Sequence, residues 1–224
     1  NTDQAYKGWD ALRSTAKNYI QRLNSHTYSG GSEHWLNARA SNDRKRLWVS
    51  EYGDGDATGI TLAQRIIKDL KLIKPTAWCY WQAIDNGGGW GCIDLDLNNR
   101  ATSATTNRKY YLFGQFTRYI RPGMVFVPNN DSNSVSAFDA NANRLVIVTV
   151  NPSAQSQAVT HDLSFWTSVG SAVTAITSDQ ANRYWQNNVG NTLNKKFTYT
   201  MPPKSVTTFQ VNATYTGTQI SGWY

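Results

Sequence analysis

The chain has 224 residues, 40% of them hydrophobic and 17% charged, and a formal net charge of +7. This composition can bury a sizeable core and excludes a disordered chain, and no apolar run is long enough to span a bilayer. The basic residues are dispersed in twos and threes, so neither nucleic acid nor a membrane is expected as a partner.

The N-terminal region predicts a helix followed by a strand. Apolar residues recur at spacings of three and four from Trp9 to Leu23, which favours one amphipathic helix with Thr2 or Asp3 as its cap. A short strand is then expected to end near residues 24–26.

The next segment predicts one βαβ unit. The apolar run 47–51 reads as a buried strand, and Thr58 or Thr61 can cap a following helix whose apolar face includes Leu62 and Ile73. Proline at position 75 ends that helix, and an aromatic-rich strand is expected over 76–83. Strands joined through a helix in this way are parallel.

The second half of the chain changes character. A glycine-rich loop over 86–91 and a helix over 107–119 lead into a region of short strands separated by turn-forming residues. Such spacing is typical of an antiparallel sandwich. The expected strands are 124–127, 134–138, 144–150, 159–165, 173–177, 196–201 and 205–211.

Glu51 is the leading candidate for chemistry. The sequence contains only two glutamates, Glu33 and Glu51, and Glu51 stands at the end of an apolar strand before a Gly-Asp-rich turn. A carboxylate in that position is where an α/β barrel places its catalytic groups. The structural alternative is a solvated Glu or a partner in an ion pair.

Several segments together resemble glycoside hydrolase family 30, most closely its endo-β-1,6-galactanase branch. They occur in the family's order over nearly the whole chain. They are residues 48–53 (WVSEYG), 54–59 (DGDATG), 77–82 (AWCYWQ), 87–91 (GGGWG), 109–116 (KYYLFGQF) with 120–123 (IRPG), and 203–209 (PKSVTTF).

The resemblance implies a (β/α)8 barrel with a side β-sandwich. Only about three barrel strands fit in this sequence, so the expected fold class is α/β plus all-β: a partial barrel, about strands six to eight, on an antiparallel sandwich. The expected domains are 1–121 for the C-terminal part of the barrel, 122–213 for the sandwich and 214–224 for a tail.

The resemblance also implies a retaining endo-glycosidase acting on β-1,6-galactan, with no cofactor. Glu51 matches the nucleophile. His26, Tyr28, Tyr52 and Trp81 are expected to bind substrate. So is Trp90, which could instead be a lid over the rim.

The acid partner is the feature that departs from the family. Retaining hydrolysis needs a second carboxyl group, which the family takes from an Asn-Glu pair, and this chain has no such pair. Glu33 is a poor substitute because it lies in a different loop. The expectation is a chain that carries the nucleophile half only, is inactive alone, and has the missing N-terminal half as its partner.

Other possibilities remain open. The substrate could be xylan, β-1,6-glucan or a glucosylated lipid, and the chain could be a non-catalytic carbohydrate-binding module. Asp54 and Asp56 are expected to form turns and not a metal site. Cys79 and Cys92 could be bridged or free. Sequons at Asn130 and Asn212 are weak glycosylation signals that favour a secreted protein.

Overall fold

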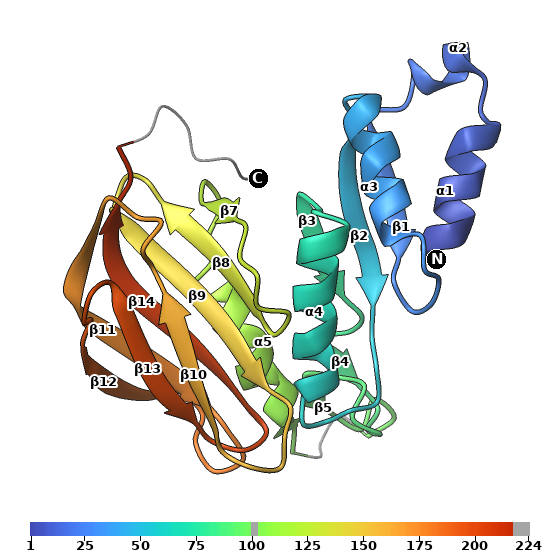
Figure 1. Ribbon diagram of the computed structural model, residues 1–224. Helices are drawn as coiled ribbons and strands as arrows, with labels where there is room; N and C mark the ends of the chain where they lie inside the picture. The colour runs from blue at the N-terminus through green and yellow to red at the C-terminus, as the bar shows by residue number, and fades with distance from the viewer. Residues whose placement is uncertain (100–102, 217–224) are drawn as a thin grey trace. The chain divides into compact units, whose positions relative to one another are not determined.

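The computed structural model describes residues 1–99 and 103–216 (Figure 1). The chain forms two compact units, and each is described by itself. The first unit comprises residues 1–55 and 65–105, and the second comprises residues 56–64 and the chain from 106 onward. Part of the predicted tail, residues 217–224, lies outside the described residues.

Helices and parallel strands alternate in the first unit. Its elements, with α4 shared between the two units and β6 at the boundary, are α1 (Thr2–Ala11), α2 (Ser14–Lys17), β1 (Arg22–His26), α3 (Glu33–Asn42), β2 (Arg46–Tyr52), α4 (Ile60–Leu72), β3 (Ala77–Tyr80), β4 (Ile84–Asp85), β5 (Ile93–Asp94) and β6 (Thr105–Thr106).

Strands β1, β2 and β3 form a parallel sheet in that order. One face of the sheet packs on helices: Leu23 of β1 and Val49 of β2 share a core with Trp9 of α1 and Leu36 of α3. The predicted βαβ unit is confirmed as β2–α4–β3, although β3 ends at Tyr80, earlier than expected.

The single N-terminal helix is a wrong prediction. Helix α1 ends at Ala11 because Leu12 is extended, with φ −73° and ψ 137°. Its N-cap is Asn1, with Thr2 already helical. Only the two ends of the periodic pattern reach the core, where Leu23 of β1 packs with Trp9 of α1, while Leu12 and Tyr19 are exposed.

The second unit is an antiparallel β-sandwich with one helix. Its elements are α5 (Arg108–Thr117), β7 (Val125–Val127), β8 (Ser134–Asp139), β9 (Arg144–Asn151), β10 (Gln157–Asp162), β11 (Ser168–Ser178), β12 (Trp185–Asn191), β13 (Lys196–Met201) and β14 (Ser205–Thr214). A six-stranded sheet runs in the order β12-β11-β14-β9-β8-β7, and β10 pairs with β13.

The sandwich core lies between these two sheets. Phe209 of β14 is fully buried and its ring packs 5.2 Å from Phe197 and 5.4 Å from Tyr199, both on β13. Helix α5 packs on the other face of the large sheet, where the Thr208 hydroxyl donates a 2.7 Å hydrogen bond to Gln115. Successive side chains of β14 therefore point alternately into the sandwich core and toward helix α5.

All seven strands expected in the second half are present; the strand expected over 196–201 has the same ends as β13, and the others have shifted ends. The sequence prediction missed β12, a strand rich in polar residues that pairs with β11 at the edge of the six-stranded sheet. Cys79 is exposed, Cys92 is buried, and both are free thiols. Within the described residues, none of the helices has both the length and the hydrophobicity that crossing a membrane requires.

Candidate active site

The carboxyl ends of β1 and β2 meet at Glu51. His26 is the register partner of Glu51, and the backbone N–H of Thr27 donates to the Glu51 carbonyl at 3.3 Å. Because the strands are parallel, the residues that follow them gather at one edge of the sheet. The segment 26–28 is thereby held alongside Glu51.

Two side chains flank the Glu51 carboxylate. The Tyr28 hydroxyl donates a 2.9 Å hydrogen bond to Oε1. The other oxygen, Oε2, lies 3.6 Å from Nε2 of His26, close enough for an ion pair when the imidazole is protonated. The carboxylate side chain is 27% exposed, so it is oriented by its neighbours and still open to a ligand.

Burial and the adjacent carboxylate keep Tyr28 protonated. Burial first, and then the hydrogen bond and charge of Glu51, raise the pKa of Tyr28 to about 12. The phenol is therefore a hydrogen-bond donor at any physiological pH. Its ring lies 5.6 Å from that of Tyr52, which is buried and only 8% exposed.

Tyr52 and Trp78 form the wall behind the site. The Tyr52 ring lies 6.0 Å from that of Trp78, which stacks 6.5 Å from Tyr80. Burial, followed by the charge of Asp54, raises the pKa of Tyr52 above its usual range. The predicted role of Tyr52 in substrate binding stays a prediction, since the ring is in this wall and little of it is exposed.

Trp81 and Trp90 lie on the loops that follow β3. Trp81 is 50% exposed and Trp90 is 41% exposed. The Trp81 backbone N–H donates to the Tyr52 carbonyl at 2.7 Å, and the Tyr80 hydroxyl holds the Trp90 carbonyl at 2.7 Å. Both indoles are thus anchored through the backbone with free ring surface, as a sugar platform requires.

Gly53 makes this arrangement possible. A Cβ at this position would overlap the backbone carbonyl of Trp81 and lie 3.3 Å from the Trp90 ring. The segment after Glu51 can therefore approach the Trp81 backbone and the Trp90 ring only because residue 53 has no side chain.

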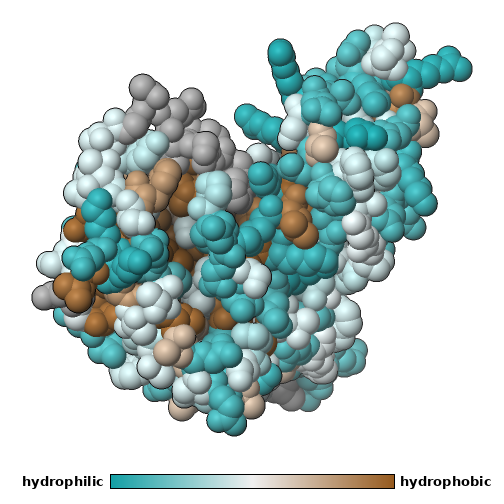
Figure 2. All heavy atoms as spheres, viewed as in Figure 1, coloured by the Kyte–Doolittle hydropathy of each residue, from teal (hydrophilic) through white to brown (hydrophobic). Residues whose placement is uncertain are grey.

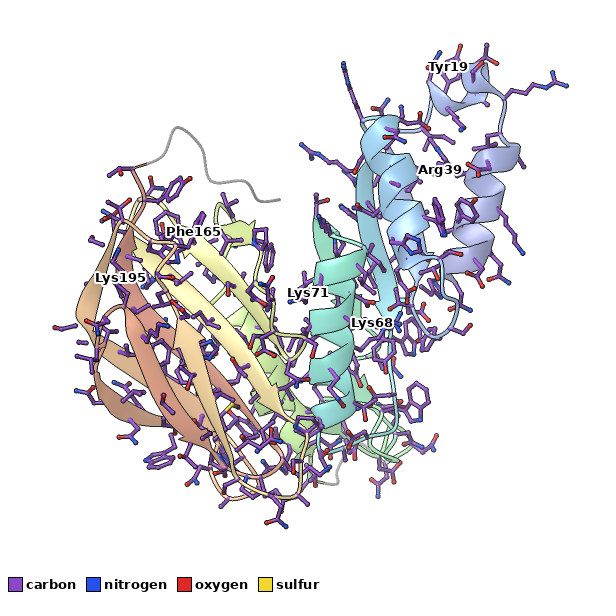
Figure 3. The ribbon with its side chains drawn as sticks, viewed as in Figure 1. Tyr19, Arg39, Lys68, Lys71, Phe165 and Lys195 are labelled. Atoms are coloured by element: carbon purple, nitrogen blue, oxygen red, sulfur yellow. The ribbon has the colours of Figure 1, made fainter. Side chains whose placement is uncertain are left out.

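Glu33 is held as a structural anion. It is 3% exposed at the start of α3 and lies 2.8 Å from Lys68 Nζ and 3.6 Å from Arg65 Nη2. Burial opposes the charge, but the Lys68 hydrogen bond and the two cations leave the pKa of Glu33 below its usual value. A general acid needs a raised pKa, so Glu33 does not fit that role. Figure 3 labels Lys68 on α4.

Sequence reasoning missed two carboxylates near the site. Asp54, which was predicted to form a turn, hydrogen-bonds Tyr52, and its negative charge helps to raise the pKa of Tyr28. Asp69 of α4 is fully buried and bonds Thr27. The only signal for Asp69 was an acidic residue amid the apolar spacing of the α4 helix.

The remaining predictions concern metals and glycans. Across residues 1–99 and 103–216 no group of three or more His, Cys, Asp or Glu side chains is arranged to hold a metal ion. Asn130 and Asn212 are both exposed. Their glycosylation stays a prediction.

The site can orient a carboxylate against a bound sugar. Glu51 has one oxygen fixed by a phenol and one beside an imidazole, with exposed indoles on the adjoining loops. This equips it for nucleophilic attack on an anomeric carbon.

Comparison with known proteins agrees with this chemistry. No family model matches the chain. It is 37% identical over 220 residues to the endo-beta-1,6-galactanase of Hypocrea rufa, across 94% of this chain and 45% of that enzyme. The chain thus spans about half the length of this curated relative.

Solved structures share the fold. A GH30 endoxylanase from Clostridium papyrosolvens C71 matches with a TM-score of 0.69 and 24% identity, over 90% of this chain and 51% of that one. A family 30 subfamily 8 xylanase from Clostridium acetobutylicum matches with a TM-score of 0.74 and 23% identity, over 95% and 52%. The chain is therefore similar in sequence to an endo-β-1,6-galactanase and shares its fold with xylanases of glycoside hydrolase family 30.

Proposed function

We propose that the chain is the nucleophile half of a retaining endo-glycosidase that hydrolyses β-1,6-galactan, the side chains of arabinogalactan. The observation that carries the proposal is Glu51 at the carboxyl end of β2, with the Tyr28 hydroxyl bonded to it at 2.9 Å. In this mechanism Glu51 attacks the anomeric carbon while the glycosidic C–O bond breaks and a general acid protonates the leaving oxygen. Water, deprotonated by that same group, then displaces Glu51 from the glycosyl-enzyme.

The general acid is proposed to come from a second segment, the N-terminal half of the same enzyme. A retaining pair needs two carboxyl groups about 5–5.5 Å apart. In this proposal residues 1–121 are the C-terminal part of a barrel, with β1, β2 and β3 as its strands six, seven and eight.

The parallel sheet supports this incomplete-barrel proposal. Arg22, Asn24 and His26 of β1 point away from the helix-covered face and are exposed. Parallel sheets are normally covered on both faces. Within the described residues β1 and β3 are also the sheet edges, with no further strand paired to either. More strands would complete both the edges and the open face.

The sandwich supports it independently. A groove of about 530 Å³ is lined by apolar residues such as Val127, Leu145 and Trp166 and runs beside residues 160–163. Strand β10 bounds this groove and pairs only with β13 in the described part of the chain. Figure 2 shows hydrophobic residues in brown on this unit, and Figure 3 places Phe165 at its surface. An added strand would cover the groove.

The choice of galactan rests on the relative with 37% identity. The xylanases match at 24% identity or less, so xylan is the second candidate, followed by β-1,6-glucan and glucosylceramide. A non-catalytic carbohydrate-binding sandwich is the alternative from another class. An extracellular, secreted location is also proposed, as expected for an enzyme that acts on a cell-wall polysaccharide.

The test uses this chain joined to the half of the Hypocrea rufa enzyme that it does not cover. We expect release of β-1,6-linked galacto-oligosaccharides, with xylan untouched. Glu51→Gln should lower kcat on the order of 10³-fold, while the exposed-carboxylate control Asp10→Asn leaves it unchanged. Glycan binding without hydrolysis would favour the module, and full activity of the chain alone would refute the half-enzyme proposal.

A further inference from the structure

Asp69 connects three elements beneath the site. It lies on α4 and is 0% exposed. Its Oδ2 accepts a 2.8 Å hydrogen bond from the Thr27 hydroxyl and a 2.9 Å hydrogen bond from Nε1 of Trp78. One carboxylate oxygen therefore joins the segment after β1 to β3.

Arg65 compensates the buried charge. Its Nε lies 3.0 Å from Oδ1 of Asp69, one helical turn away. The guanidinium also lies 5.7 Å from the centroid of the Tyr52 ring and, at Nη2, 3.6 Å from Glu33. A buried carboxylate is tolerated only when it is paired and hydrogen-bonded, and here both conditions are met. The arrangement is thus a built network and not an accidental contact.

Thr27 is the link to the reacting group. It is fully buried and stands between His26 and Tyr28, the two residues that flank Glu51. Its backbone N–H holds the Glu51 carbonyl while its hydroxyl holds Asp69. A shift of Thr27 would therefore move both flanking side chains together.

Trp78 is the second link. Its indole N–H is fixed by Asp69, and its ring packs 6.0 Å from Tyr52, which in turn contacts Tyr28. Asp69 is thus connected to Tyr28 through two sets of contacts. One runs along the backbone from Thr27, and the other runs through the rings of Trp78 and Tyr52.

We propose that Asp69 is a positioning residue, which fixes Thr27 and Trp78 and through them sets the Tyr28 hydroxyl against the Glu51 carboxylate. The catalytic meaning of this arrangement rests on the proposed function of Glu51. The positioning itself does not, and it can be measured on this chain without a glycosidase assay.

The first measurement follows Tyr28. Phenolate absorbance is recorded during an alkaline titration of the parent chain and of Tyr28→Phe. The difference between the two curves is the ionisation of Tyr28, with a pKa of about 12. In Thr27→Val, which keeps the shape and removes the hydroxyl, we expect this pKa to fall toward the ordinary tyrosine value of 10. Thr27→Ser, which restores a hydroxyl, should return it to about 12. A component that stays at about 12 in Thr27→Val would overturn the proposal.

The second measurement follows Trp78. In the proton NMR spectrum, the indole N–H resonance of Trp78 is assigned by its loss in Trp78→Phe. We expect it at low field and slow to exchange with solvent, because the group donates to a buried carboxylate. Asp69→Asn should move it upfield and speed its exchange, whereas Asp10→Asn, at an exposed ion pair with Arg39, should leave it unchanged. An unchanged indole signal in folded Asp69→Asn would overturn the proposal. If Asp69→Asn does not fold, the comparison of Thr27→Val with Thr27→Ser tests the proposal by itself.

Discussion

The Tyr28 hydroxyl donates a 2.9 Å hydrogen bond to Oε1 of Glu51, and the two residues are 23 positions apart in the sequence. The contact exists because β1 and β2 are parallel and in register at His26 and Glu51. It fixes one oxygen of the carboxylate and leaves the other beside His26. The orientation of Glu51 is therefore a product of strand pairing.

The first prediction concerns the alkaline stability of this contact. The folded-state pKa of Tyr28 is raised from 10 to about 12, so its stabilising effect is complete below pH 10 and is lost as the pH rises to about 12. Tyr28→Phe should make the free energy of unfolding less dependent on pH in this window. Chemical denaturation between pH 9 and 12 measures it.

Tyr19→Phe is the matched control, because Tyr19 is 87% exposed (Figure 3). It should leave the pH dependence as in the parent chain. Equal effects of the two substitutions would mean that the Tyr28 contact is not formed in solution.

The second prediction compares two glycines. Gly53→Ala places a Cβ on the Trp81 carbonyl and should destabilise the first unit by about 2 kcal/mol or more, since backbone must move. Gly8→Ala, in α1 with open space around its Cβ, should stabilise by about 0.5–1 kcal/mol through helix propensity. Thermal unfolding of both variants tests this, and a harmless Gly53→Ala would refute the close approach of β2 to the Trp81 loop.

The third prediction concerns the sandwich at acid pH. His161 packs 5.1 Å from Phe197 and 5.0 Å from Phe209, and burial lowers its pKa from 6.5 to about 4, against a small opposing effect of Asp131. The unfolded chain binds a proton first as the pH falls, so stability is full above pH 6.5 and declines toward pH 4. The maximum loss is about 3 kcal/mol.

His161→Phe should flatten this decline, as followed by the unfolding temperature at pH 7, 5.5 and 4.5. The exposed His34 provides the comparison: His34→Gln should retain the decline. An unaltered pH dependence in His161→Phe would show that this histidine is not buried in its neutral form.

The fold was largely predictable where periodicity and burial coincide. The apolar face of α4 is buried as expected, and the predicted strands β8, β9 and β14 are buried along most of their length. The N-terminal helix was wrong because periodicity does not report the extended backbone at Leu12. Strand β12 was missed because an edge strand buries little and needs few apolar residues.

The residues of the site also differ in whether the sequence predicted them. Glu51 was predicted from its place at the end of an apolar strand, whereas His26 and Tyr28 were predicted from the family resemblance. Asp69 and Arg65 come from a helix and reach the site only through packing. No local pattern indicates which acidic residue on a helix will be buried beneath the neighbouring strands.

The most direct test of the account is the position of a covalent label. An activated 2-deoxy-2-fluoro-β-galactoside is incubated with this chain joined to the uncovered half of the Hypocrea rufa enzyme, and the labelled peptide is mapped by mass spectrometry. We expect one added sugar on Glu51, absent in Glu51→Gln. A label on any other carboxylate would contradict it.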